Sequence, residues 1–89
     1  MISKADKKKI REISHKYKVK RVLLFGSGLS PDRESRDIDI GVEGVPAKDF
    51  FSVYGDLMLA LSKPVDVVDL SVSSKFVRSV REEGVPLYG

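Results

Sequence analysis

The chain has 89 residues, of which 42% are hydrophobic and 33% charged, and its formal net charge is +3. This length suits a single domain over residues 1–89 with one small core. The lack of cysteine and the single histidine, His15, exclude disulfides, thiolate nucleophiles and Cys-ligated zinc, and make a His-based zinc site or a Ser-His-Asp triad very hard to assemble. No stretch approaches the ~20 consecutive apolar residues of a membrane span, and no apolar run follows the N-terminal lysines as in a signal peptide. We therefore expect a soluble, cytoplasmic protein without a membrane partner.

The first predicted element is a basic helix over residues 3–18. Its apolar side chains recur at helical spacing, at Ile10, Ile13 and Tyr17. Residues 1–21 carry nine of the sixteen Lys and Arg residues and two acids, a charge of +7, whereas residues 22–89 carry seven bases and eleven acids, a charge of −4. A basic helix can bind a polyanion such as nucleic acid, but lysines on a helix are more typical of a solvated surface. Nucleic-acid binding is therefore the weaker interpretation.

The rest of the chain alternates short strands with helices. Residues 20–25 end in an apolar run typical of a buried strand, and residues 37–42 alternate polar and apolar side chains, the pattern of a strand buried on one face. Between them, the Gly-, Ser- and Pro-rich residues 26–36 predict a loop that can hold a short turn capped by Ser30. The remaining elements are predicted as a helix over 47–62, a strand over 65–70, a helix over 72–83 and a short strand over 85–88. This order favours an α/β (α+β) fold, in which a small mixed sheet of three to four strands carries its helices on one face.

Two carboxylates follow each other on the second predicted strand. Residues two apart in a strand project from the same face, so Asp37 and Asp39 point the same way, about 7 Å apart along the chain. A divalent cation would relieve their mutual repulsion, and oxygen ligands without Cys or His favour Mg²⁺ or Mn²⁺ over zinc. On the third strand, if the alternating valines pack on the core, Asp66 rather than Asp69 emerges beside this pair. Three converging carboxylates suit two-metal phosphoryl or nucleotidyl transfer.

A Gly-Ser dipeptide directly after the first strand supplies the complementary half of such a site. Gly26 has no side chain to block the approach of phosphate to the backbone, and the Ser27 hydroxyl can donate to phosphate oxygens. By itself the dipeptide is a common turn, and an isolated Asp-x-Asp is most often a solvated strand face. The combination with a third aspartate of matching parity is far more restrictive.

With these residues in place, LLFGSGLSPDRESRDIDIGVEG, followed by KPVDVVDL and VREEGVPLYG, resembles the minimal nucleotidyltransferases (MNT) of the DNA polymerase beta superfamily over residues 20–89. The resemblance implies a polymerase-beta-like fold. It also implies roles for five residues: triphosphate binding by Gly26 and Ser27, metal binding by Asp37 and Asp39, and a third carboxylate at Asp66 that contributes to the metal site and assists deprotonation of the attacking hydroxyl.

The loop departs from the family pattern. The nine residues between Ser27 and Asp37 make a short spacing for the family, and Gly28 and Leu29 follow Ser27 where an Arg is usual. Arg36 stands before the first aspartate, where a Ser is usual. The missing early Arg is expected to weaken triphosphate binding, unless Arg36 or Arg33 reaches back to the phosphates.

The resemblance implies an enzyme that uses two Mg²⁺ ions to transfer a nucleoside monophosphate, AMP from ATP, to a hydroxyl acceptor. Family members of this length resemble antitoxins that act with a HEPN-domain toxin, a helical ribonuclease, and modify a hydroxyl-bearing side chain on it. Two alternatives stay open: a non-catalytic binding module that neutralises a partner protein, and a nucleic-acid-binding accessory domain.

One apolar stripe exceeds what a small sheet needs to cover. It consists of Phe50, Phe51, Tyr54, Leu57, Met58 and Leu61. We interpret most of it as core, with a part left over for a protein interface. The sequence leaves open whether the chain forms homo-oligomers.

Overall fold

The computed structural model describes residues 2–26 and 36–89. These residues form α1 (Lys4–Lys16), β1 (Arg21–Phe25), β2 (Ile38–Glu43), α2 (Ala47–Ala60), β3 (Val65–Asp69), α3 (Lys75–Glu83) and β4 (Val85–Tyr88). Each predicted strand and helix among them is present. The last helix begins three residues later than predicted because Ser74 caps it, its hydroxyl oxygen accepting a 3.0 Å hydrogen bond from the Val77 amide. The cap predicted at Ser30 lies outside the described residues.

The four strands form one mixed sheet in the order β3-β2-β1-β4. β1 pairs antiparallel with β2 and with β4, whereas β2 and β3 are parallel. This confirms the predicted α/β class and the mixed sheet.

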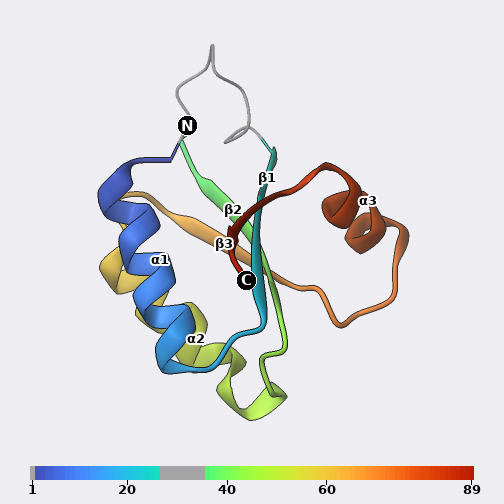
Figure 1. Cartoon of the computed structure of the whole chain (residues 1–89), viewed down its shortest axis with the longest axis horizontal. Helices are drawn as coiled ribbons and strands as arrows, with labels where there is room; N and C mark the ends of the chain where they lie inside the picture. Colours follow the sequence, from blue (N-terminus) through green and yellow to red (C-terminus); the bar gives the residue numbers. More distant parts are fainter. Residues whose placement is uncertain (1, 27–35) are drawn as a thin grey trace.

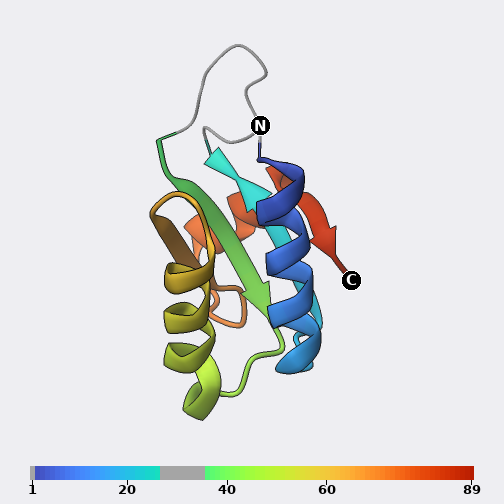
Figure 2. The same ribbon diagram turned by 90° about the vertical axis from the view of Figure 1, so that its left-hand side faces the viewer.

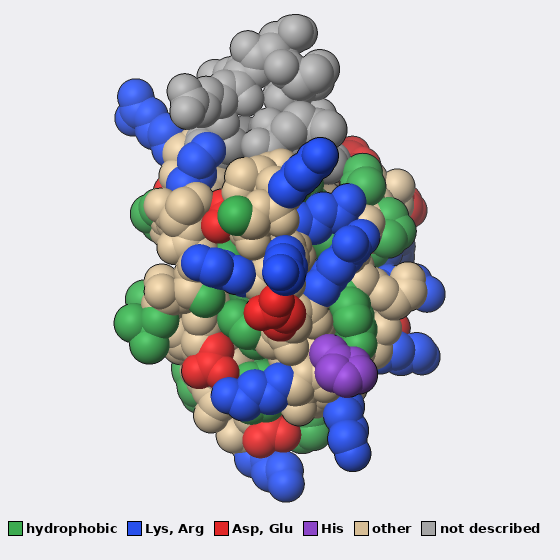
Figure 3. Space-filling view, turned by 60° about the vertical axis from the view of Figure 1, so that its left-hand side comes forward, with side chains coloured by type: hydrophobic (Ala, Val, Ile, Leu, Met, Phe, Trp, Pro, Cys, Tyr) green, Lys and Arg blue, Asp and Glu red, His purple; other side chains and the backbone are tan. Residues whose placement is uncertain are grey.

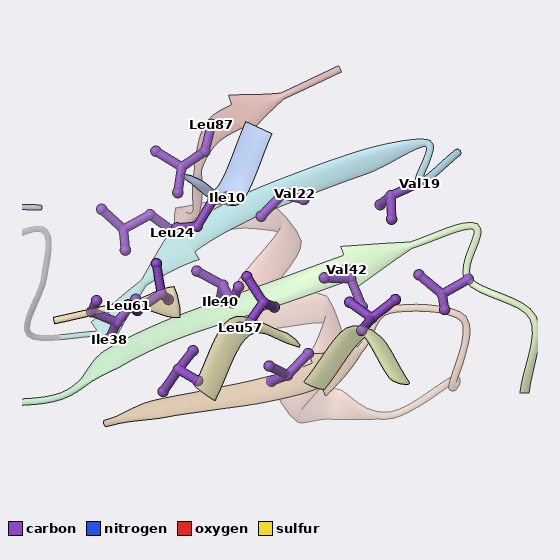
Figure 4. Close-up of a cluster of buried hydrophobic side chains, with 14 residues drawn as sticks. Ile10, Val19, Val22, Leu24, Ile38, Ile40, Val42, Leu57, Leu61 and Leu87 are labelled. Carbon is purple, nitrogen blue, oxygen red and sulfur yellow. The ribbon is translucent and has the colours of Figure 1, made fainter. Parts of the chain in front are cut away.

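The larger core lies between the sheet and the helices α1 and α2, which run side by side along it (Figure 2). Ile10 of α1 and Ile40 of β2 are fully buried, and Leu57 of α2 is almost so. Figure 4 shows these side chains converging from helices and strands with Val22, Leu24, Ile38, Val42 and Leu87. The spacing of Ile10 and the alternation of β2 therefore both serve this one core.

The third helix lies on the other face of the sheet (Figure 1), and this corrects the expectation that the helices share one face. Its Val77 and Val80 form a second buried cluster with Leu23 and Leu70. The strand order explains the difference. The β2-α2-β3 connection moves one way across the sheet and the β3-α3-β4 connection moves back the other way, so two right-handed crossovers must cover opposite faces.

The second cluster covers only one end of its face. Leu70 lies directly over Gly41, where a Cβ atom would be 2.6 Å from the Leu70 Cδ2 atom. At the same end Arg81 of α3 forms a 2.6 Å ion pair with Glu43 and donates a 2.8 Å hydrogen bond to the Leu70 carbonyl. The opposite end, where β1 ends and β2 and β3 begin, holds the aspartates.

Basic side chains gather over the face of the molecule that carries α1 (Figure 3). The lysines of α1 are mostly exposed, while its apolar side chains pack inward. This distribution is the amphipathic pattern of a surface helix. None of the helices in the described parts of the chain has the length and apolar character needed to cross a membrane.

Candidate active site

Two aspartates lie beside each other on neighbouring parallel strands. The register aligns Asp39 of β2 with Asp66 of β3, and aligned residues of adjacent strands project from the same face. This is the face that also carries Leu23 and α3. Asp39 is partly buried and Asp66 is exposed, so the pair opens to solvent at the uncovered end of the face.

The surroundings of the Asp39 carboxyl disfavour its ionised form. Burial raises its pKa above the usual value, and the negative charges of Asp66 and Asp37, with a hydrogen bond shared with Asp66, raise the pKa further. A cation near this pair would be attracted to both carboxylates and would lower the pKa of Asp39 again.

Gly26 lies directly against the Asp39 carboxylate of this pair. It follows the last residue of β1 with a φ of +72°, a left-handed conformation that favours glycine. A Cβ atom on Gly26 would be 2.6 Å from the Asp39 Oδ2 atom, so any side chain there would collide with the carboxylate. Gly26 thus keeps the backbone of the turn in direct contact with the acidic centre. Ser27, the other predicted phosphate-binding residue, lies outside the described residues, as do Gly28, Leu29 and Arg33.

Asp37 and Arg36 precede β2 and are exposed. The charge of Asp37 acts on Asp39, which places it at the edge of the same acidic region. In the described residues, 2–26 and 36–89, no group of three or more His, Cys, Asp or Glu side chains converges closely enough to hold a metal ion as it stands. Asp39 and Asp66 nevertheless suit Mg²⁺, because this ion is usually held by one or two carboxylates together with substrate phosphates and water.

Asp69, the acid that competed with Asp66 in the sequence, lies away from this pair. It is aligned with Val42, whose side chain belongs to the core face. Its carboxylate instead accepts hydrogen bonds from the backbone amide (2.9 Å) and hydroxyl (2.7 Å) of Ser71.

An aromatic pair beside the carboxylates was missed by sequence reasoning. Phe25 is aligned with Asp39 across the β1–β2 ladder, and its ring packs edge-to-face on Phe76 of α3 with 5.8 Å between ring centroids. Phe76 remains 56% exposed. That Phe25 and Asp39 share a face follows from the pairing of β1 with β2, and Phe76 reaches Phe25 only because α3 packs on that face.

A family profile described as polymerase beta, nucleotidyltransferase matches residues 8–89. The chain belongs to this nucleotidyltransferase family. No curated protein matches the chain. The nucleotidyltransferase is similar to several solved structures, each spanning most of its length.

Three examples among these structures are toxin–antitoxin complexes. One is a toxin–antitoxin with AMP-PNP, at 27% identity and a TM-score of 0.75, covering 93% of this chain and 73% of the other. A second is the MntA-HepT toxin–antitoxin, at 25% identity and a TM-score of 0.72, covering 98% and 73%. The third is a tri-AMPylated HEPN toxin of Shewanella oneidensis in complex with an MNT antitoxin, at 28% identity and a TM-score of 0.71, covering 94% and 70%. These matches confirm the resemblance of this nucleotidyltransferase to MNT antitoxins.

Proposed function

We propose that this protein is a Mg²⁺-dependent adenylyltransferase that transfers AMP from ATP to a hydroxyl on a HEPN-domain toxin, and so acts as the antitoxin of the pair. The observation that carries the proposal is the alignment of Asp39 with Asp66 directly against Gly26. Two carboxylates that repel each other next to a bare backbone turn suit a cation and the phosphates it accompanies.

In the proposed reaction, the acceptor hydroxyl oxygen bonds to the α-phosphorus of ATP as the bond from that phosphorus to the bridging oxygen breaks. Pyrophosphate leaves with the electron pair, and the hydroxyl proton passes to a base. We assign Asp66 to assist that deprotonation, because it is the exposed member of the pair. Gly26, Ser27 and Arg36 are assigned to the triphosphate. Mg²⁺ held by Asp37, Asp39 and Asp66 would stabilise negative charge on the phosphates.

The relatives support both the substrate and the acceptor. One similar structure contains AMP-PNP, an analogue of ATP, and another contains a HEPN toxin that is tri-AMPylated and bound to an MNT antitoxin. A protein acceptor also agrees with the exposed position of Asp66, which a side chain on another protein can approach.

The test is transfer of label from α-labelled ATP to a cognate HEPN-domain protein in the presence of Mg²⁺. Asp66→Asn and Asp39→Asn should each lower the labelling rate by at least about 100-fold, the lower range for loss of a group that acts on the proton or the charge in the transition state. Asp69→Asn is the matched control, because it removes a carboxylate from the same strand that faces away from the pair. It should label the partner at nearly the wild-type rate.

Labelling that survives both substitutions would refute the assignment of the site. A complex that inhibits the toxin without any labelling, and without nucleotide binding by calorimetry, would instead support the non-catalytic binding module. Retention of RNA or DNA that weakens steeply with salt would support the nucleic-acid-binding alternative.

A further inference from the structure

A partly exposed aromatic ring lies beside the carboxylates. Phe76, in the first turn of α3, is 56% exposed although it is a large apolar side chain. It packs edge-to-face on Phe25, with 5.8 Å between the ring centroids. The next residue, Val77, is buried in the cluster beneath α3, and its amide donates a hydrogen bond to the Ser74 cap. Phe76 is therefore held in place by its neighbours while much of its ring surface stays free.

Strand pairing places the Phe25 ring on one side of the acidic centre. Asp66, Asp39 and Phe25 are aligned on three neighbouring strands, β3, β2 and β1, so they form one row across the sheet face. Residues paired across antiparallel strands, as Asp39 and Phe25 are, have Cβ atoms about 4.5–5.5 Å apart. Phe25 thus lies next to Asp39 on the side away from Asp66, and Phe76 extends this aromatic surface.

We propose that Phe76, supported by Phe25, is the surface on which the base of the nucleotide stacks, and that this surface selects purines over pyrimidines. The inference rests on the proposed function, in which the triphosphate lies against Gly26 and the acceptor hydroxyl meets Asp66. The acceptor then approaches on the β3 side of Asp39, which leaves the β1 side to the nucleoside. Gly26 directly follows Phe25 in the chain, so phosphates held at this turn keep the attached nucleoside near the rings.

Stacking is the interaction that this pair of rings can offer. Every base has a π-face, and an aromatic side chain binds it through contact area and ring electrostatics rather than through hydrogen bonds. Because the contact with Phe25 fixes Phe76 before the nucleotide arrives, little side-chain freedom is lost on binding. The two fused rings of a purine cover more of a phenyl ring than the single ring of a pyrimidine does. This difference in contact area is the origin of the expected preference.

Calorimetry on the full chain with Mg²⁺ and a nonhydrolysable ATP analogue tests the proposal, with tripolyphosphate as the ligand that lacks a nucleoside. Phe76→Ala should weaken binding of the ATP analogue at least about 5-fold, the lower range for loss of one stack of a base on an aromatic ring. It should leave the affinity for tripolyphosphate unchanged, which also shows that the variant is folded. The wild type should bind the ATP analogue more tightly than the matching CTP analogue, and Phe76→Ala should remove most of this difference.

Phe51 supplies the matched control. It belongs to the part of the α2 stripe that stays outside the core, is 82% exposed, and packs edge-to-face on Phe50 with 5.9 Å between ring centroids. The helix that carries it covers the sheet face opposite the aspartates. Phe51→Ala should therefore leave the binding of both ligands unchanged.

A spectroscopic signal can locate the base directly. The chain contains no tryptophan, so Phe76→Trp introduces a single indole that can be excited selectively. The ATP analogue should change its fluorescence and tripolyphosphate should not. Phe51→Trp should respond to neither ligand.

The outcomes separate this inference from the proposed function. A Phe76→Ala variant that binds the ATP analogue as tightly as the wild type would overturn the inference alone, when Asp39→Asn still weakens binding. An equal loss of affinity for both ligands would also overturn it, because the ring would then act through the fold. A chain that binds neither ligand, or binds both regardless of Asp39→Asn, would overturn the proposed function and this inference with it. Unchanged nucleotide affinity with slower labelling of the toxin would assign the ring to the acceptor protein instead.

Discussion

At the scale of single residues, Gly26 is the position where the backbone and the acidic centre are closest. Its φ of +72° favours glycine, and a Cβ atom at this position would also be 2.6 Å from the Asp39 Oδ2 atom. Both features disfavour any other residue there. Gly26→Ala should destabilise folding by about 1–2 kcal/mol, the cost of a left-handed alanine. It should also lower nucleotidyl transfer more than 10-fold, because the Asp39 carboxylate must move. Thermal unfolding and the labelling rate measure the two effects.

Gly55→Ala is the control for this change, because the added methyl group meets no atom of the chain. Within α2 it should stabilise the protein by about 0.5–1 kcal/mol and leave transfer activity unchanged. If Gly26→Ala retained full activity, contact between the turn and Asp39 would have no part in the chemistry.

The sequence predicts the position of a site residue only where side-chain alternation along that residue's own strand is enough to fix it. Strand parity suffices to favour Asp66 over Asp69, because alternation fixes the face once the valines are assigned to the core. The contact between Gly26 and Asp39 depends on the pairing of β1 with β2, which no local pattern contains. Phe76 was missed for the same reason, since its neighbour Phe25 lies about fifty residues away in the chain.

At the scale of elements, the start of α1 is joined to the segment after α2 by a buried carboxylate. Asp6 accepts hydrogen bonds from the Ser62 amide (3.0 Å) and the Ser62 hydroxyl (2.5 Å). Burial acts to raise the pKa of Asp6, but these bonds, with a hydrogen bond from the Ser3 side chain and the charge of Lys9, outweigh burial and lower the pKa below its usual value. The ionised form of Asp6 therefore stabilises the packing of α1.

The sign of the pH dependence follows from this lowered pKa. The stabilisation is complete above the unfolded-state pKa of about 3.9 and is lost as pH falls through the lower folded-state pKa. Asp6→Asn should destabilise the protein by about 1–3 kcal/mol at pH 7 and lessen the loss of stability between about pH 5 and pH 2. Urea unfolding at several pH values measures both effects. If Asp6→Asn lost stability between about pH 5 and pH 2 as steeply as the wild type does, the assignment would be contradicted.

The elements themselves were predictable from periodicity, capping and breakers, but the side of the sheet that α3 covers was not. Val77 and Val80 show that the helix has a buried side without showing which face of the sheet receives it. That choice follows from the strand order, in which β4 lies beyond β1 rather than beside β3. The strand order is set by long-range pairing, and the handedness rule can be applied only after it is known.

At the scale of the whole molecule, α3 and its cluster cover one end of a sheet face and leave the other end to mutually repelling carboxylates. Without a cation, that end should lower the stability of the fold, as strained functional sites often do. Asp39→Asn removes one charge and keeps a group that can donate to Asp66. In EDTA it should raise the stability by roughly 1 kcal/mol or less, which is a few degrees in melting temperature for a chain of this size.

The same substitution should have the opposite effect when ligand is present. Mg²⁺ with a nonhydrolysable ATP analogue should raise the melting temperature of the wild type, because binding to the folded state stabilises it by mass action. The Asp39→Asn variant should lose most of this rise. Asp69→Asn should instead gain nothing in EDTA, since Asp69 is already satisfied by Ser71, and should keep the ligand-dependent rise. If Asp39→Asn gave no gain in stability over the wild type in EDTA, as is expected for Asp69→Asn, Asp39 and Asp66 would not repel each other in the folded protein, and the physical reason for a cation between them would be lost.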